Sequence, residues 1–163
     1  MKMPRRSVAG FTMVELVVVI VITGIIATIA VNRFSDDRAL SEHGYKNQLA
    51  GLLRYGQKVA LAARREVCVV LTANGGTQGG AALAMNPTTT AGAACSVPAA
   101  LPGQGGTYSI VTPTGLNLPA MAFRFDANGR PITNAGAALA TFTIAVTNAG
   151  LPLTVESETG HVH

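Results

Sequence analysis

The sequence predicts an α+β fold in which a long N-terminal helix, one half in a membrane and one half amphipathic, packs on a small antiparallel β-sheet domain. Residues 11–31 are apolar, and from Leu40 to Ala63 apolar residues recur at steps of three and four, as on one face of a helix. After Glu66 the pattern changes to short alternating or β-branched runs separated by turn residues. A helix followed by short strands that turns connect is typical of α+β proteins.

Residues 11–31 form an uninterrupted apolar stretch whose only charged residue is Glu15. As a helix, this stretch would span roughly 31 Å, about the hydrocarbon thickness of a bilayer. It is longer than the apolar core of a secretory signal peptide, and it is apolar on every face, which argues against an ordinary core helix. A carboxylate inside a membrane costs about 2.5–3.5 kcal/mol and therefore usually has a partner. No basic residue lies three or four positions from Glu15, so we expect its partner in another chain, a lipid headgroup or a chain terminus.

Cleavage between Gly10 and Phe11 would create a free amine one helical turn from Glu15, able to pair with the same carboxylate on a neighbouring copy. The segment Gly10–Leu16, GFTMVEL, resembles the processing site of type IV prepilins and type II secretion pseudopilins. The resemblance implies that prepilin peptidase cuts after Gly10 and methylates Phe11, and that Phe11 and Glu15 dock subunits. It implies as partners other pilin or pseudopilin subunits, bound through the N-terminal helix, an inner-membrane assembly platform and, before assembly, membrane lipid. A plain membrane anchor that keeps residues 1–10 and a cleaved secretory signal are the alternatives.

The charges beside the apolar stretch predict its orientation. Lys2, Arg5 and Arg6 precede it, whereas the charges of residues 33–38 cancel. By the positive-inside rule the N-terminus is cytoplasmic, and the chain is a single-pass protein of the bacterial inner membrane with a periplasmic C-terminal domain, before it enters a pilus or pseudopilus. Residues 1–10 hold three of the 12 Lys and Arg residues and none of the eight Asp and Glu residues, so without them the net charge falls from +4 to +1. The basic composition is therefore poor evidence for nucleic-acid binding.

The chain is expected to have four segments: a leader over residues 1–10, a transmembrane or filament-core helix over 11–35, its amphipathic continuation over 36–65 and a periplasmic β-rich domain over 66–163. One long helix from Phe11 to about Ala63 is predicted, with Gly44 as the expected point of any bend. Strands are predicted over residues 67–71, 81–85, 108–111, 121–125, 141–146 and 153–157. Turns are predicted at 72–80, 126–131 and 148–150, and a long loop at 86–106.

Resemblance to known families extends more diffusely into the C-terminal domain. Residues 123–131, FRFDANGRP, followed by a hairpin and Gly160, resemble H-type pseudopilins and FimT-like minor pilins, and residues 156–163 resemble minor pilins of the mannose-sensitive haemagglutinin (MSHA) pilus. This implies a minor subunit with a place at the tip or in initiation of a type IV pilus or type II secretion pseudopilus. The alternative is a tip subunit of a competence or adhesive pilus that binds DNA or a surface ligand. FimT-like pilins that take up DNA carry Gly-Arg-x-Arg where this chain has residues 160–163, GHVH, a departure that argues against DNA binding.

Few other residues are candidates for a site. In an oxidising compartment Cys68 and Cys95 favour a disulfide, and two buried thiols are the alternative. Arg54, Lys58 and Arg65 lie near one helical face and could contact DNA phosphates or anionic headgroups, whereas a solvated face, or a contact with acids on adjacent subunits, is the plainer interpretation. No cofactor motif, metal-ligand spacing or catalytic set stands out, so the sequence favours a structural protein over an enzyme.

Overall fold

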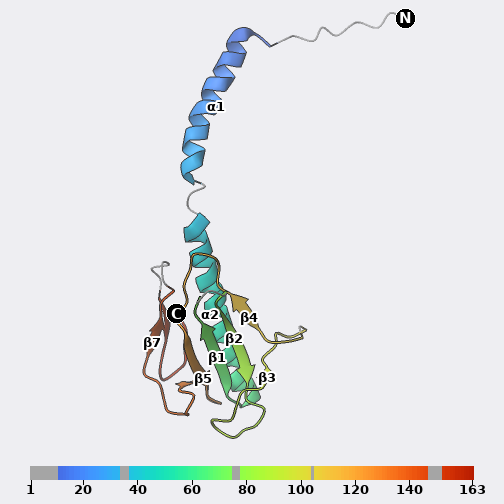
Figure 1. Cartoon of the computed structure of the whole chain (residues 1–163), viewed down its shortest axis with the longest axis vertical. Coiled ribbons are helices and arrows are strands. Elements are labelled where there is room, and N and C mark those ends of the chain that lie inside the picture. Colours follow the sequence, from blue (N-terminus) through green and yellow to red (C-terminus); the bar gives the residue numbers. More distant parts are fainter. Residues whose placement is uncertain (1–10, 34–36, 75–77, 104, 147–151) are drawn as a thin grey trace, which may run out of the picture. The chain divides into compact units, whose positions relative to one another are not determined.

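The computed structural model describes residues 11–33, 37–74, 78–103, 105–146 and 152–163, with the main chain alone for residues 29–33 and 37–39. The chain divides into two compact units, Met1–Arg38 and Ala39–His163 (Figure 1). The predicted leader and the predicted turn at 148–150 lie outside the described residues.

Helix α1 (Met13–Arg33) begins directly after Thr12. The main-chain nitrogen of Glu15 donates a hydrogen bond to Thr12 Oγ1 at 3.3 Å, so Thr12 is the N-cap of the helix. Thr23 and Thr28, further along, donate their hydroxyl protons to main-chain oxygens one turn back, at 2.7 Å each. The polar groups of these threonine side chains are therefore satisfied inside the helix itself.

The predicted membrane segment is helical up to Arg33. Residues 34–36 lie outside the described part of the chain, so a single helix from Phe11 to Ala63 stays a prediction. Among the residues whose placement is described, no helix is both long and apolar enough to cross a membrane.

Helix α2 (Asp37–Ala63) runs through Gly44 without interruption. Its buried face consists of Tyr45, Leu49, Ala50, Leu52, Leu53 and Ala60. Gly56 also belongs to this face, because a Cβ there would come within 3.1 Å of a methyl group of Leu83. The helix ends when Arg64 takes a left-handed conformation, φ 54°, and the nitrogen of Arg65 bonds to the oxygen of Ala60, which is a Schellman arrangement.

The larger sheet has β1 (Val67–Thr72) at its centre, paired antiparallel with β2 (Gly80–Met85) and β5 (Met121–Phe125). The short strands β3 (Val97–Pro98) and β4 (Ser109–Val111) both pair with β2, and β6 (Pro131–Ile132) pairs with β5. A second sheet consists of β7 (Phe142–Ile144) and β8 (Leu153–Val155). The predicted α+β class with antiparallel pairing is confirmed. Three details differ from the prediction: β3 lies inside the predicted loop, β6 begins at the last residue of the predicted turn at 126–131, and the strands form two sheets.

The core of the second unit lies between α2 and one face of the larger sheet (Figure 1). Because side chains alternate along a strand, Val67, Val69 and Leu71 of β1 enter this core. Cys68, Val70 and Thr72 share the opposite face of the larger sheet, which we call the outer face. The second sheet closes one end of the core, where the rings of Phe123 and Phe142 meet edge to face at 5.1 Å.

Candidate functional site

The predicted processing site lies at the start of α1. Gly10 is outside the described residues, whereas Phe11 precedes the helix and is 76% exposed. Glu15 lies exposed in the first turn, where a negative charge suits the positive end of the helix dipole. Thr12 already satisfies the amide of Glu15, and no described side chain pairs with the Glu15 carboxylate. The carboxylate is therefore available to a group outside the described chain.

The large apolar side chains from Met13 to Ile26 of α1 are exposed. The large hydrophobic residues from Met13 to Ile26 each keep between 48% and 86% of their surface exposed. Soluble monomers rarely expose a continuous apolar surface of this kind, and such surfaces mark contacts with proteins or membranes. The α1 surface is thus an interaction surface that requires a partner.

Comparison with known proteins identifies this region. Residues 5–31 match the family model described as the prokaryotic N-terminal methylation motif. This motif is the hallmark of type IV pilins and pseudopilins. Pilins with this motif are anchored in the membrane before they assemble with other subunits and are processed by prepilin peptidase. Comparisons with curated proteins and with solved structures give no significant match.

The three basic residues proposed for anion binding do not form a patch of free cations. Arg54 donates from Nε and NH2 to the main-chain oxygen of Val162, at 3.1 and 2.9 Å. Arg65 lies beyond the end of α2, and its NH1 donates to the oxygen of Pro87 at 2.8 Å. Lys58 is exposed, and the described residues give it no partner. Two of the three charges therefore have structural contacts, and the geometry adds no support for nucleic-acid binding.

The disulfide predicted from the sequence is present between Cys68 and Cys95, whose Cα atoms are 6.1 Å apart. Cys68 lies on the outer face of β1, directly opposite Arg124 of β5. Cys95 belongs to the segment between β2 and β3, and residues 86–95 of this segment are called the Asn86–Cys95 loop below. The disulfide fastens the end of this loop to the central strand of the sheet.

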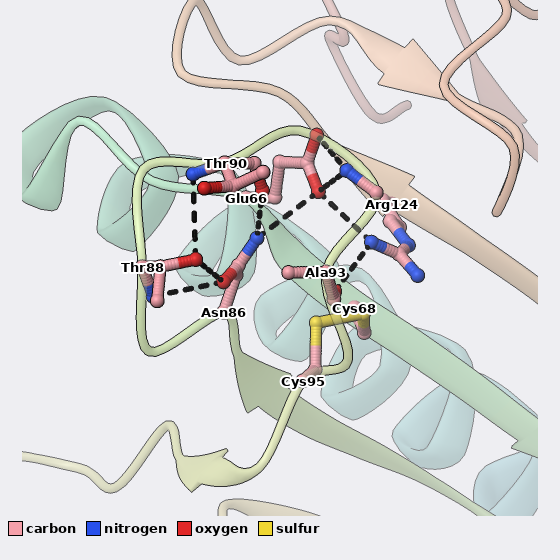
Figure 2. The surroundings of a disulfide bond; sticks show 9 residues. Glu66, Cys68, Asn86, Thr88, Thr90, Ala93, Cys95 and Arg124 are labelled. Atoms are coloured by element: carbon pink, nitrogen blue, oxygen red, sulfur yellow. Dashed lines mark hydrogen bonds and ion pairs between the residues drawn. A yellow bond between two sulfur atoms is a disulfide. The ribbon is translucent and has the colours of Figure 1, made fainter.

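A buried ion pair that the sequence did not reveal lies beside the disulfide. Arg124 NH1 is 2.9 Å from Glu66 Oε2, and both side chains are only 9% exposed. Figure 2 shows the two side chains pointing toward each other beneath the loop. Arg124 alternates with the core residues Phe123 and Phe125, a pattern that indicates a solvent-facing position. The sequence carries no signal that the Asn86–Cys95 loop covers this position.

Two hollows in the described part of the second unit contain no catalytic set. One, of about 210 Å³, follows the paired segments of β2 and β4. The other, of about 310 Å³, is lined by Thr141, Thr154, Glu156, Ser157, Glu158 and His163. There the Ser157 hydroxyl bonds with Thr141, and the described residues show no bond from it to His163. In the described chain no group of three His, Cys, Asp or Glu residues could hold a metal ion, and neither hollow joins a hydroxyl nucleophile to a base.

Proposed function

We propose that the chain is a minor pilin or pseudopilin, cut after Gly10 and built through α1 into a type IV pilus or a type II secretion pseudopilus. The observation that carries the proposal is the coincidence of two features. Residues 5–31 match the methylation motif, and the helix that begins inside this match exposes apolar side chains on all its faces. The resemblance of residues 123–131 to minor subunits supports a low-copy subunit at the tip or in initiation.

Assembly follows from the physical chemistry of α1. Exposing apolar surface to water costs about 25 cal/mol per Å², so a helix of this kind that leaves the membrane must stay covered, and packing against the same helix of other subunits provides that cover. Glu15 supplies the register, since its carboxylate has no partner among the described residues and cleavage would create an amine at Phe11 of a neighbouring subunit. An unpaired charge inside a helix bundle is costly, so only the arrangement that pairs the two groups is stable.

Before assembly, on this proposal, the inner membrane holds residues 11–31, with the N-terminus in the cytoplasm and the second unit in the periplasm. Support comes from the motif and from the three positive charges of residues 1–10. In spheroplasts from cells without prepilin peptidase, where residues 1–10 stay attached, added protease should then digest the C-terminal domain, while an epitope tag placed before residue 1 stays protected. Protection of the C-terminal domain would contradict this topology.

Processing is tested by mass spectrometry of the N-terminus in cells that contain a prepilin peptidase. The wild-type chain should begin at Phe11 and carry one methyl group, and Gly10→Val should retain residues 1–10. Ser7→Ala, a change within the leader away from the cut, is the matched control and should be processed like the wild type. A mature N-terminus at any other residue would overturn the proposed cleavage.

The docking role of Glu15 is tested with Glu15→Gln, which removes the charge and keeps the shape. The variant should be cut and inserted normally, and its incorporation into filaments should fall at least about tenfold, because loss of an ion pair in an apolar environment costs more than 1.4 kcal/mol. Thr23→Val is the control, since the Thr23 hydroxyl bonds only within its own helix among the described residues. Normal incorporation of Glu15→Gln would show that the carboxylate does not guide docking.

A further inference from the structure

The Asn86–Cys95 loop is fastened to the sheet by polar contacts that are separate from its disulfide. The carboxylate of Glu66 accepts the Gly92 amide at 3.1 and 3.2 Å, and Arg124 NH1 donates to the Ala93 oxygen at 2.8 Å. At the start of the loop the nitrogen of Asn86 donates to the oxygen of Glu66 at 2.9 Å. These contacts hold the loop on both sides of its tip without any contribution from the sulfur atoms (Figure 2).

The loop also has internal order. Asn86 Nδ2 donates to the Thr90 oxygen at 2.7 Å, and Asn86 Oδ1 accepts the Thr88 amide at 2.9 Å. The hydroxyl of Thr88 in turn accepts the Thr90 amide at 3.3 Å. The side chain of Asn86, itself buried, thus folds the first half of the loop into a fixed shape.

The ion pair lies beside the site of bond formation. Cys68 is directly opposite Arg124 in the pairing of β1 with β5. Glu66 directly precedes β1 and is two residues before Cys68. All three side chains therefore share the outer face of the sheet. Arg124 bonds to Ala93, which is two residues before Cys95, so docking of Ala93 brings the second cysteine to the first.

We infer that Glu66 and Arg124 are positioning residues for the oxidation of Cys68 and Cys95: they dock the Asn86–Cys95 loop on β1 while both cysteines are still thiols. In an unfolded chain the two cysteines are 27 residues apart, and a flexible loop of this length must lose conformational entropy to close. A docked loop has already lost that entropy. The effective concentration of one thiol at the other is then much higher than in the unfolded chain.

The chemistry requires a disulfide as the oxidant. The thiolate of one cysteine attacks a donor disulfide, which forms a mixed disulfide and releases one donor thiolate. The thiolate of the second cysteine attacks the protein sulfur of the mixed disulfide and releases the other donor thiolate. The two cysteine protons go to solvent or to the released thiolates, and the donor takes up two electrons. The docked loop accelerates only the second, intramolecular step.

The competing order of events is that the disulfide forms first and the polar contacts follow. The two orders predict different positions of the Asn86–Cys95 loop in a chain that lacks the disulfide. If the polar contacts come first, the loop stays docked in a chain that cannot form the disulfide. If the disulfide comes first, the loop detaches in that chain.

The first experiment measures the effective concentration of the two thiols in the full chain in detergent, equilibrated with oxidised and reduced glutathione. Arg124→Met and Glu66→Gln should each lower this concentration at least about tenfold under native conditions, because a buried ion pair with one partner removed is strongly destabilised. In concentrated denaturant all variants should match the wild type. The controls are Arg130→Met and Glu158→Gln, which disrupt an exposed pair at 3.9 Å and should have no effect. Unchanged values for Arg124→Met and Glu66→Gln in the native chain would overturn the inference.

The second experiment begins with a variant that keeps both Glu66 and Arg124. In the full chain with Cys68→Ala and Cys95→Ala together, hydrogen exchange at the Gly92 and Thr88 amides should remain within about tenfold of the oxidised wild type. Exchange as fast as in an unstructured peptide would show that the disulfide holds the loop, and would overturn the inference. Adding Glu66→Gln to the double alanine variant should then release the Gly92 amide, because its acceptor is weakened. Persistent protection in the triple variant would also count against the role of Glu66.

Discussion

Gly160 lies so close to the main-chain oxygen of Gly129 that a Cβ carbon on Gly160 would overlap that oxygen. Gly160 also has φ 66°, in the left-handed region that favours glycine. Gln57 Nε2 of α2 donates to both the Gly129 oxygen, at 3.3 Å, and the Thr159 oxygen, at 2.6 Å. The turn after β5, the C-terminal segment and α2 therefore meet at one closely packed point. Gly160 is one of the features in which the sequence resembles H-type pseudopilins and FimT-like minor pilins, and this packing gives a steric reason for a glycine there.

Gly160→Ala should lower the free energy of unfolding by about 2–5 kcal/mol, since the left-handed conformation and the overlap with Gly129 both oppose a Cβ. Gly136→Ala is the matched control: φ is 86° there too, but a Cβ would meet no atom within 4 Å. That variant should lose only about 1–2 kcal/mol. Urea unfolding, monitored by tyrosine fluorescence, measures the loss of stability in both variants. Equal losses would show that the contact with Gly129 does not constrain residue 160.

Arg54→Met should destabilise the chain by about 1–3 kcal/mol, because it leaves the main-chain oxygen of buried Val162 without its two donors. Lys58→Met removes a charge one turn further along the same exposed side of α2 and should change stability by less than about 0.5 kcal/mol. The same unfolding measurement separates them. If the two variants lost the same stability, Arg54 would be a solvated charge and not a contact that fastens the C-terminal segment.

Local sequence patterns predicted much of the fold. The change from helical spacing to alternation after Glu66 gave the order of elements, and β1, β2 and β5 lie within a residue or so of their predicted positions. The Asn128-Gly129 pair predicted the turn after β5, where Asp126 now accepts two main-chain amides. The disulfide could be predicted from the number of cysteines, since the two cysteines of a chain in an oxidising compartment have one way to pair within it.

The remaining features depend on contacts between distant segments. Arg124 looks solvent-facing because its strand alternates, and only the docked Asn86–Cys95 loop makes it buried. Arg54 was assigned to a basic face because helical spacing is visible in sequence, whereas its acceptor is 108 residues away. β3 has two residues, too few for any periodicity to appear. Thr12 did carry a local signal, since Thr-x-x-Glu before an apolar run is a capping pattern, and the same residues also form part of the segment that resembles a processing site.

Thr12→Val should fray the first turn of α1, because the Glu15 amide loses its acceptor at 3.3 Å. The loss of an N-cap costs about 1 kcal/mol, so hydrogen exchange at the Glu15 amide should accelerate about fivefold in the full chain in detergent. Thr12→Ser and Thr12→Asn keep a capping oxygen and should exchange like the wild type. If Ser and Asn behaved like Val, a property of Thr12 other than its oxygen would determine where the helix begins.

Tyr45 should make the stability of the second unit fall at alkaline pH. Its hydroxyl is buried and hydrogen-bonded with that of Thr112 at 2.8 Å. Burial raises the pKa of Tyr45 above its ordinary value of about 10, and the hydrogen bond with Thr112 lowers it by less. Above about pH 10 the unfolded chain loses the phenol proton while the folded chain keeps it, so unfolding becomes easier until the folded pKa is passed. Below that pH the contribution is constant.

The stability of Tyr45→Phe, measured by urea unfolding between about pH 8 and pH 11, should therefore decline less with pH than that of the wild type, although its stability at pH 8 is lower by the lost hydrogen bond. Thr112→Val should have the opposite effect on the pH dependence. It removes the contact that lowers the pKa of Tyr45, so the folded chain keeps the phenol proton to a higher pH. The free energy of unfolding therefore goes on falling to a higher pH than in the wild type. A decline in Tyr45→Phe as steep as in the wild type would mean that another group controls the alkaline transition.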